Sequence, residues 1–243
     1  DHTERLMNYL KIKFKKKILS KNSTSIELNG PYEIKPRDII VASDPSSAAF
    51  FIVGALIIPE SMITLKNIAL NKSRIAFIDV LKKMGGKITV KKTKTISGED
   101  VGDIHVKYSL LNAIKIKASS SPYLIDEYPI LSIAASQAKG VTVMRGLSEL
   151  RHKESDRIKS ITTNLAKLGF RVVSKNDNIS IKGSSKIQIE KKKKIKSYGD
   201  HRIAMSFVIL SLLYKSKLII DDESCISISY PDFRKHLKKL SIH

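Results

Sequence analysis

Between residues 44 and 243 the chain repeats one pattern three times, and this repetition limits the folds available to it. Each repeat opens with an aspartate that leads into small and aliphatic residues, at Asp44, Asp126 and Asp200. A β-branched segment follows, and then an amphipathic segment that closes on apolar residues 40, 42 and 40 positions after the aspartate. Because the repeats start roughly 70–80 residues apart, farther than in solenoids, the sequence predicts one compact pseudo-threefold domain.

The periodicity within each repeat indicates which elements lie inside. The leading helical runs are apolar nearly all round, so they must be buried; they span 45–58, 127–138 and 201–214. The strands between them alternate apolar residues with lysine or serine and therefore keep one face in water. The sequence thus predicts an α/β fold of three pseudo-symmetric helix–strand–helix–strand–strand units, with helices inside and sheets outside.

Residues 1–43 do not follow the repeat. Their pattern predicts a short helix over 3–10 and then two or three strands rich in lysine, isoleucine and serine. Pro31, Pro36 and the Ser-Asp-Pro turn at 43–45 interrupt this stretch. We therefore expect a domain boundary at Asp44, with 1–43 belonging to one domain and 44–243 forming another.

The net charge of +21 raises the question of a polyanionic partner. Only nine of the 44 basic residues are arginine, and the 35 lysines are spread along the whole chain. Aromatic residues, on which nucleic-acid-binding proteins stack bases, make up only 6%. We therefore expect no nucleic-acid partner and place most lysines on the outward faces of strands.

The positions of cysteine, histidine and glycine exclude several classes of protein. A single cysteine, Cys225, rules out a disulfide framework and a thiolate zinc cage, and it fits a reducing compartment. The longest apolar run, 48–59, is too short to cross a bilayer. The histidines show no metal-ligand spacing, and no glycine-rich nucleotide loop follows a strand. We expect a cytoplasmic protein without membrane contact and with no metal or organic cofactor.

Charged residues that occur in only one repeat need a reason other than the shared fold. In the second repeat a charged cluster begins the amphipathic helix, and its Arg157 aligns with Ser73 and Ser229. Lys153 and Arg157 are four residues apart, which predicts a shared helix face with Glu154 one step round. Two cations in a first turn oppose the helix dipole, and this conflict favours a bound anion over a merely solvated helix start.

The leading helices add two further groups. Arg202 aligns with Ser46 and Tyr128, and an arginine where a buried helix begins needs an acidic partner or a phosphate. The leading aspartates are typical helix N-caps, but Asp126 is open to a second interpretation as a proton-transfer group. Because the helix starts converge on one end of the domain, we predict a phosphate- and carboxylate-binding site with acid/base capacity. The predicted site consists of Lys153, Arg157, Arg202, Asp126 and Glu154.

Five stretches resemble the 5-enolpyruvylshikimate-3-phosphate synthase family, and the last three are highly specific. The stretches are DHTERL at 1–6, SDPSSAAF at 43–50, LIDEYPIL at 124–131, LRHKESDRI at 150–158 and GDHRIAMSF at 199–207. The pattern resembles the bacterial class whose members tend to tolerate glyphosate more than the enteric or plant class. The resemblance implies the enolpyruvate transferase fold, an inside-out α/β barrel with three units per domain. On this basis 1–43 is the remnant of the N-terminal domain and 44–243 is the C-terminal domain.

The resemblance also implies a reaction and a role for each predicted site residue. The family transfers the carboxyvinyl group of phosphoenolpyruvate to the 5-hydroxyl of shikimate 3-phosphate and releases phosphate, in the pathway to chorismate and the aromatic amino acids. By motif, Asp126 is similar to the proton acceptor that also holds the shikimate hydroxyl, and Glu154 handles the proton on the methylene carbon. Lys153 would contact shikimate 3-phosphate, while Arg157 and Arg202 would bind phosphoenolpyruvate. No cofactor is implied, and the full-length protein is expected to be a monomer.

The sequence departs from the family pattern in two places. Residues 227–231 supply no lysine where many members have one near the last helix, and Arg234 or Lys235 is the nearest substitute. The chain also begins after most of the family's N-terminal domain would have ended, so we expect it to be inactive alone.

Three other readings stay open at this point. The UDP-N-acetylglucosamine enolpyruvyl transferases share the fold, although their equivalent of KESDR differs. A basic nucleic-acid-binding module would lose affinity steeply with salt. A non-catalytic scaffold fragment would gain no stability from the substrates.

Overall fold

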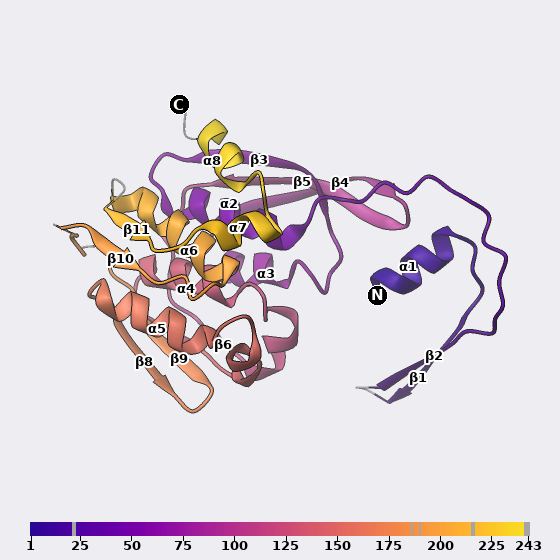
Figure 1. Ribbon diagram of the computed structural model, residues 1–243, viewed down its shortest axis with the longest axis horizontal. Helices are drawn as coiled ribbons and strands as arrows, with labels where there is room; N and C mark the ends of the chain where they lie inside the picture. The colour runs from indigo at the N-terminus through magenta and orange to yellow at the C-terminus, as the bar shows by residue number, and fades with distance from the viewer. Residues whose placement is uncertain (21–22, 186, 190, 215–216, 241–243) are drawn as a thin grey trace.

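Three buried helices form the centre of the molecule. The computed structural model describes residues 1–240 except 21–22, 186, 190 and 215–216. The central helices are α2 (Pro45–Ile57), α4 (Tyr128–Gln137) and α6 (His201–Ser211), and each contacts the other two. Nearly every residue of the three is buried, as their all-round apolar sequences require. Figure 1 shows them between the sheets, so the predicted arrangement of helices inside and sheets outside is confirmed.

Two sheets, whose strands pair mostly in antiparallel fashion, cover these helices. The first has the order β3-β5-β4, from β3 (Met62–Ala69), β4 (Lys87–Ile96) and β5 (Glu99–Lys107). The second has the order β6-β7-β9-β8, from β6 (Lys115–Ile116), β7 (Val141–Met144), β8 (Arg171–Lys175) and β9 (Asn178–Lys182). Along β9, Ile179 and Ile181 are buried while Lys182 is exposed. Alternation of this kind places the apolar side chains on the helices and lysine in water.

An amphipathic helix completes each unit on the outside of the core. These helices are α3 (Ala76–Lys83), α5 (Arg157–Lys167) and α8 (Phe233–Leu240). Short 3-10 turns lie between the main elements, as η1 (Ala118–Tyr123), η2 (Ser148–His152) and η3 (Leu212–Tyr214). In α8, Phe233 packs edge-on against Phe50 of α2, with ring centroids 6.1 Å apart. The closing helix of the third unit is therefore anchored to the leading helix of the first.

The third unit differs from the predicted pattern. Its strand β11 (Leu218–Ile220) pairs in parallel with β10 (Lys193–Ile195), and α7 (Ser224–Ser229) precedes α8. Within the described part of the chain no strand follows α8, so the helix–strand–helix–strand–strand order holds for the first two units only. The alternation of apolar and polar residues over 187–190 also favours a strand. Residues 187–189 form none, and residue 190 lies outside the described residues.

The first 43 residues stand apart from this body in Figure 1. They contain α1 (His2–Tyr9) and a hairpin of β1 (Lys15–Ser20) with β2 (Ser23–Glu27), whose residues are all exposed. The main polar links to the body run from α1 and the residue before it. His2 Nδ1 lies 2.5 Å from Glu99 Oε1, and Asn71 Nδ2 donates to Asp1 Oδ1 at 2.6 Å. The division at residue 44 stays a prediction.

Among the described residues, no helix is both long enough and apolar enough to span a bilayer.

Candidate functional site

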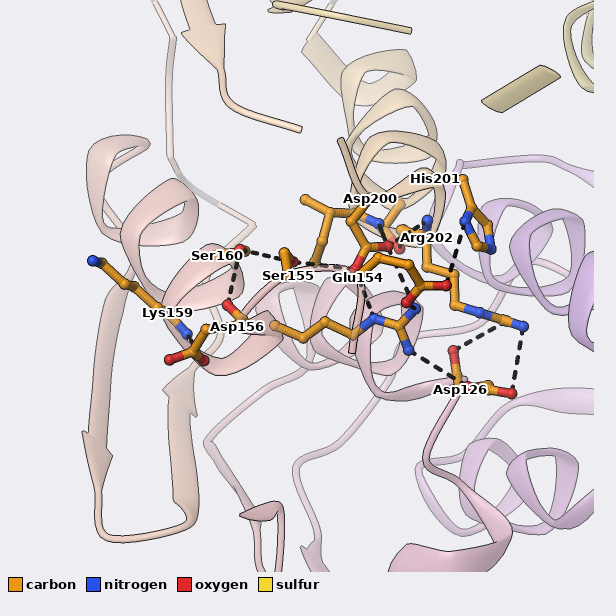
Figure 2. A network of polar contacts seen from close by, with 12 residues as sticks. Asp126, Glu154, Ser155, Asp156, Lys159, Ser160, Asp200, His201 and Arg202 are labelled. Carbon is orange, nitrogen blue, oxygen red and sulfur yellow. Dashed lines mark hydrogen bonds and ion pairs between the residues drawn. The ribbon is translucent and has the colours of Figure 1, made fainter. Parts of the chain in front are cut away.

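A group of acidic and basic side chains gathers where α5 and α6 begin and just before α4 (Figure 2). We call it the charged cluster, and its members are Asp126, Glu154, Arg157, Asp200 and Arg202. Two local caps fix its geometry. The side chain of Asp200 accepts from the backbone nitrogens of Arg202 and Ile203, and that of Asp156 accepts from the nitrogen of Lys159. These caps set the residue at which each helix begins and hence the direction of the side chains in its first turn.

Arg157 is the centre of the charged cluster. Its side chain is 1% exposed and contacts three carboxylates. Nε donates to Asp200 Oδ2 at 2.8 Å, Nη2 to Glu154 Oε2 at 2.7 Å, and Nη1 to Asp126 Oδ1 at 3.4 Å. A buried guanidinium is tolerated only when its charge and its N–H groups are matched in this way. The sequence analysis predicted a bound anion beside Arg157, whereas its partners in this structure are three carboxylates.

Asp126 connects Arg157 to two further arginines. Arg202 Nη2 lies 3.4 Å from Asp126 Oδ2, and Arg202 Nη1 donates to the backbone carbonyl of Asp126 at 3.3 Å. Arg74 Nη1 lies 4.0 Å from the same carboxylate, so one arginine from each unit approaches it. Burial by itself would raise the pKa of Asp126, but Arg202 and Arg157, followed by Lys153, outweigh it and leave that pKa lowered.

Asp126 is not a helix cap, although the other two leading aspartates are. Asp44 and Asp200 each accept hydrogen bonds from backbone nitrogens in the first turn of the following helix. Helix α4 begins at Tyr128, one residue later than the alignment predicts, and places Glu127 at the N-cap position without a side-chain cap bond. The N-cap interpretation is therefore wrong for Asp126, whose carboxylate is left free to face the arginines.

Lys153 does not share a helix face with Arg157, contrary to the sequence prediction. It follows the 3-10 turn η2 with an extended backbone, at φ −95° and ψ −164°. The reason is the cap at Asp156, which starts α5 at Arg157 and leaves Lys153 outside the helix. Lys153 instead lines a cavity of about 360 Å³ together with Ser121 and Ile125. The argument that two stacked cations need an anion between them therefore fails, although the charge of Lys153 still acts on Asp126.

Glu154 is the most accessible acid of the charged cluster. Its side chain is 47% exposed, whereas Asp200 is fully buried. His201 Nδ1 lies 3.9 Å from Glu154 Oε1. Burial lowers the pKa of His201, and the neighbouring Arg202 lowers it further, so the imidazole is neutral at physiological pH. A half-exposed carboxylate beside a neutral imidazole is suited to exchange protons with a bound molecule.

Sequence reasoning missed three residues at the edge of the charged cluster. Ser46 and Glu127 are buried and bonded to each other, with Ser46 Oγ donating to Glu127 Oε1 at 2.5 Å. Arg74 Nη2 donates to the same hydroxyl at 2.6 Å. Arg74 directly follows Ser73, the residue of the first repeat that aligns with Arg157. The charge of the first repeat is therefore offset by one position from that of the second, and this offset is the sequence signal for Arg74.

The substitutes considered for the missing family lysine are engaged elsewhere. Arg234 Nε donates to Glu223 Oε2 at 2.8 Å, and Lys235 Nζ pairs with Asp232 at 3.5 Å. Both pairs are on exposed surface at α8. In the described part of the chain, neither residue forms a hydrogen bond or ion pair with the charged cluster.

No group of three or more histidine, cysteine, aspartate or glutamate side chains in the described residues could hold a metal ion. The carboxylates of Asp126, Glu154 and Asp200 all face the guanidinium of Arg157.

The arrangement of helices and strands identifies the fold. The enolpyruvyl transferase NikO from Streptomyces tendae, which is 16% identical, has a similar fold. The two match with a TM-score of 0.73 over 94% of this chain and 50% of that one. The chain thus has the enolpyruvate transferase fold.

The sequence is more specific than the fold. The EPSP synthase (3-phosphoshikimate 1-carboxyvinyltransferase) family model matches residues 1–237, and the chain belongs to that family. A 3-phosphoshikimate 1-carboxyvinyltransferase from Petrotoga mobilis is 42% identical over 240 residues, and one from Sulfurihydrogenibium is 41% identical over 241. The structure of EPSP synthase from Acinetobacter baumannii matches with a TM-score of 0.87 at 35% identity, covering 99% of this chain and 54% of that one. The alignment with the Petrotoga relative likewise covers 99% of this chain and 54% of the relative. The chain spans about half the length of the curated relatives it matches.

Proposed function

We propose that this chain supplies part of the active site of a 3-phosphoshikimate 1-carboxyvinyltransferase. One observation carries the proposal. The carboxylate of Asp126 lies between Arg157 and Arg202, 3.4 Å from each, where two helices begin. An acceptor for protons and two guanidinium groups for anions are thus within one small molecule's reach of each other. Family membership makes phosphoenolpyruvate and shikimate 3-phosphate the substrates to test.

Arg157 and Arg202 bind the carboxylate and phosphate of phosphoenolpyruvate in this proposal. Guanidinium groups pair with such anions through two parallel hydrogen bonds. In the structure Arg157 donates a hydrogen bond to the Asp126 carboxylate and Arg202 forms an ion pair with it, so a bound anion takes over contacts that this carboxylate now makes. Lys153, which is in no helix and lines a cavity beside Ser121, contacts shikimate 3-phosphate.

Asp126 and Glu154 move the protons. The 5-hydroxyl oxygen of shikimate 3-phosphate forms a bond to C2 of phosphoenolpyruvate, its proton passes to Asp126, and Glu154 donates a proton to C3. In the second step Glu154 takes a proton back from C3 while the bond from C2 to the phosphate oxygen breaks. The proton on Asp126 leaves with the phosphate, so the step balances. The positive groups stabilise charge on the reacting anion throughout.

The compartment and the assembly of the full-length protein follow from the same proposal. We place the activity in the cytoplasm, because Cys225 is buried and unpaired, as expected in a reducing environment. We further propose that the full-length protein is a monomer, with residues 1–43 and 44–243 in separate domains.

Release of phosphate tests this function. The chain is mixed with the part of the Petrotoga mobilis relative that it does not cover, and both substrates are added. We expect release from the mixture and none from the chain alone. An Arg202→Gln substitution should lower the rate by about 100-fold, as removal of one charge-stabilising donor does.

Arg151→Gln is the matched control, because Arg151 pairs with Asp156 and Asp177 on the surface. It should retain the full rate. An equal rate from the Arg202→Gln mixture would overturn the assignment of Arg202, and full activity of the chain alone would overturn the shared active site.

A further inference from the structure

The first unit contributes an arginine to the edge of the charged cluster from a segment between two elements. The other two units contribute theirs from the starts of helices. The position that holds Arg202 in α6 is occupied by Ser46 in α2. Ser46 has no charge, but its hydroxyl accepts a hydrogen bond from Arg74 Nη2 at 2.6 Å. The segment between β3 and α3 thereby delivers a guanidinium to the place where the pseudo-symmetry lacks one.

A buried acid fixes the hydroxyl that holds Arg74. Ser46 Oγ donates to Glu127 Oε1 at 2.5 Å, and both residues are buried, at 2% and 3% exposure. A serine hydroxyl has one proton to donate, so donation to Glu127 turns its lone pairs toward Arg74. Ser46 and Glu127 are thus held in place by packing. They orient Arg74, whose side chain is more exposed, at 36%.

Arg74 differs from Arg157 and Arg202 in its distance from Asp126. Its Nη1 lies 4.0 Å from Asp126 Oδ2, whereas each of the other two arginines approaches the carboxylate to 3.4 Å. At 4.0 Å the guanidinium exerts a charge effect without a hydrogen bond of normal length. Arg74 has its own anchor in Ser46, so its position does not depend on Asp126.

We propose that Arg74 is a positioning residue for Asp126, held against that carboxylate by the buried Ser46–Glu127 pair. When an anionic substrate takes the hydrogen bonds of Arg157 and Arg202, Arg74 stays beside Asp126. This last consequence rests on the proposed function, whereas the placement of Arg74 does not. Asp126 would otherwise lose the positive neighbours that keep it ionised and ready to accept a proton.

Asp126 has few charged neighbours, so the effect of each one on its carboxylate can be tested by a separate substitution. Positive charge comes from α6, from α5 and the segment before it, and from the segment before α3. The negative groups are Glu127 next in the chain, together with Glu154 and Asp200 across Arg157. The positive groups are Arg202, Arg157, Lys153 and Arg74.

Carbon-13 NMR titration of the Asp126 carboxyl in the 243-residue chain, without any substrate, tests the proposal. Replacement of Arg74 by glutamine should move the midpoint of the Asp126 titration to higher pH, because one positive neighbour is lost. Arg74→Lys should restore part of the effect, since it keeps the charge but not the forked hydrogen bonds. Ser46→Ala should move the midpoint in the same direction as Arg74→Gln by releasing the guanidinium.

Arg151→Gln is the control: it removes an arginine that pairs with Asp156 and Asp177, so the midpoint of the Asp126 titration should equal that of the wild type. Amide spectra establish that each variant is folded. If Arg74→Gln does not fold, Arg74→Lys and Ser46→Ala carry the test. Midpoints that coincide with the wild type in every folded variant would refute the positioning role, whatever the result of the phosphate-release assay.

Discussion

Helices α2 and α6 begin directly after their leading aspartates, whereas α4 begins one residue later. The leading aspartate therefore caps the helix in two units and contacts arginine side chains in the other. Asp44 and Asp200 cap their helices by accepting hydrogen bonds from backbone nitrogens. In the second unit the helix begins one residue later, so Asp126 caps nothing and contacts Arg157 and Arg202. A residue that recurs at the same position of each repeat can thus change its contacts when the start of the following helix shifts by one residue.

The two capping aspartates also differ from each other. Asp200 is buried and pairs with Arg157, whereas the side chain of Asp44, within the described residues, bonds only to the backbone and a hydroxyl of its own helix start. The three helix starts therefore form a series: a cap alone, a cap that also holds a buried arginine, and a carboxylate freed from capping.

The largest expected effect concerns the cap that holds the arginine. Asp200→Asn keeps a good N-cap residue but removes the buried charge opposite Arg157. Removing one partner of a buried ion pair costs about 3–5 kcal/mol, so we expect a loss of that order in the free energy of unfolding, measured by urea denaturation. Asp44→Asn is the matched control and should be nearly neutral. Equal losses in the two variants would show that both aspartates act only as caps.

A smaller effect is expected at the cap without a partner. Asp44→Ala removes the acceptor for the backbone nitrogens of Ser46 and Ser47 and should cost about 1 kcal/mol in urea denaturation. Because asparagine caps as well as aspartate, Asp44→Asn should restore the lost stability. A loss that persists in Asp44→Asn would mean that the charge of Asp44, and not its cap, stabilises α2.

The smallest expected effect distinguishes the adjacent acids Asp126 and Glu127 by the pH dependence of unfolding. The pKa of Asp126 is lowered below its ordinary 3.8, because the arginines outweigh burial. The pKa of Glu127 is raised above its ordinary 4.5, chiefly by burial. The contribution of Asp126 is therefore lost as pH falls through its folded-state pKa, whereas that of Glu127 is complete below 4.5 and is lost as pH rises through its folded-state pKa.

Urea denaturation across the acid and neutral range measures both contributions. Relative to Asp126→Asn, the wild type should lose stability on the acid side; relative to Glu127→Gln, it should lose stability as pH rises above 4.5. Slopes of the same sign for the two comparisons would show that these neighbours share one environment.

Much of the fold could be predicted because the pattern of apolar residues in the repeats indicates which helices and which strand faces are buried. The leading helix of each unit is apolar all round, and strands such as β9 alternate, so inside and outside follow from the residues alone. The third unit could not be predicted as well. Its strand β11 pairs in parallel with β10, which lies before the leading helix in the chain, and long-range pairing of this kind leaves no local signal.

The contacts between the predicted site residues could be inferred only in part, and the roles of these residues stay predictions. The charges of Arg157 and Arg202 stand out against their aligned counterparts, and both contact Asp126. The placement of Lys153 was wrong, because the cap at Asp156 competes with a helix that would start earlier. Arg74 was missed because its role depends on Ser46 and Glu127, which come from two other segments of the chain.

The burial of Arg157 lowers the conformational entropy that its side chain would lose on binding an anion. A free arginine side chain gives up about 2 kcal/mol of rotamer freedom when it is immobilised. Contacts with three carboxylates at 2.7–3.4 Å already fix Arg157 before any ligand arrives. In the proposed function, an incoming anion would therefore only exchange one oxygen partner of Arg157 for another, because the cost of ordering the guanidinium is met when the chain folds.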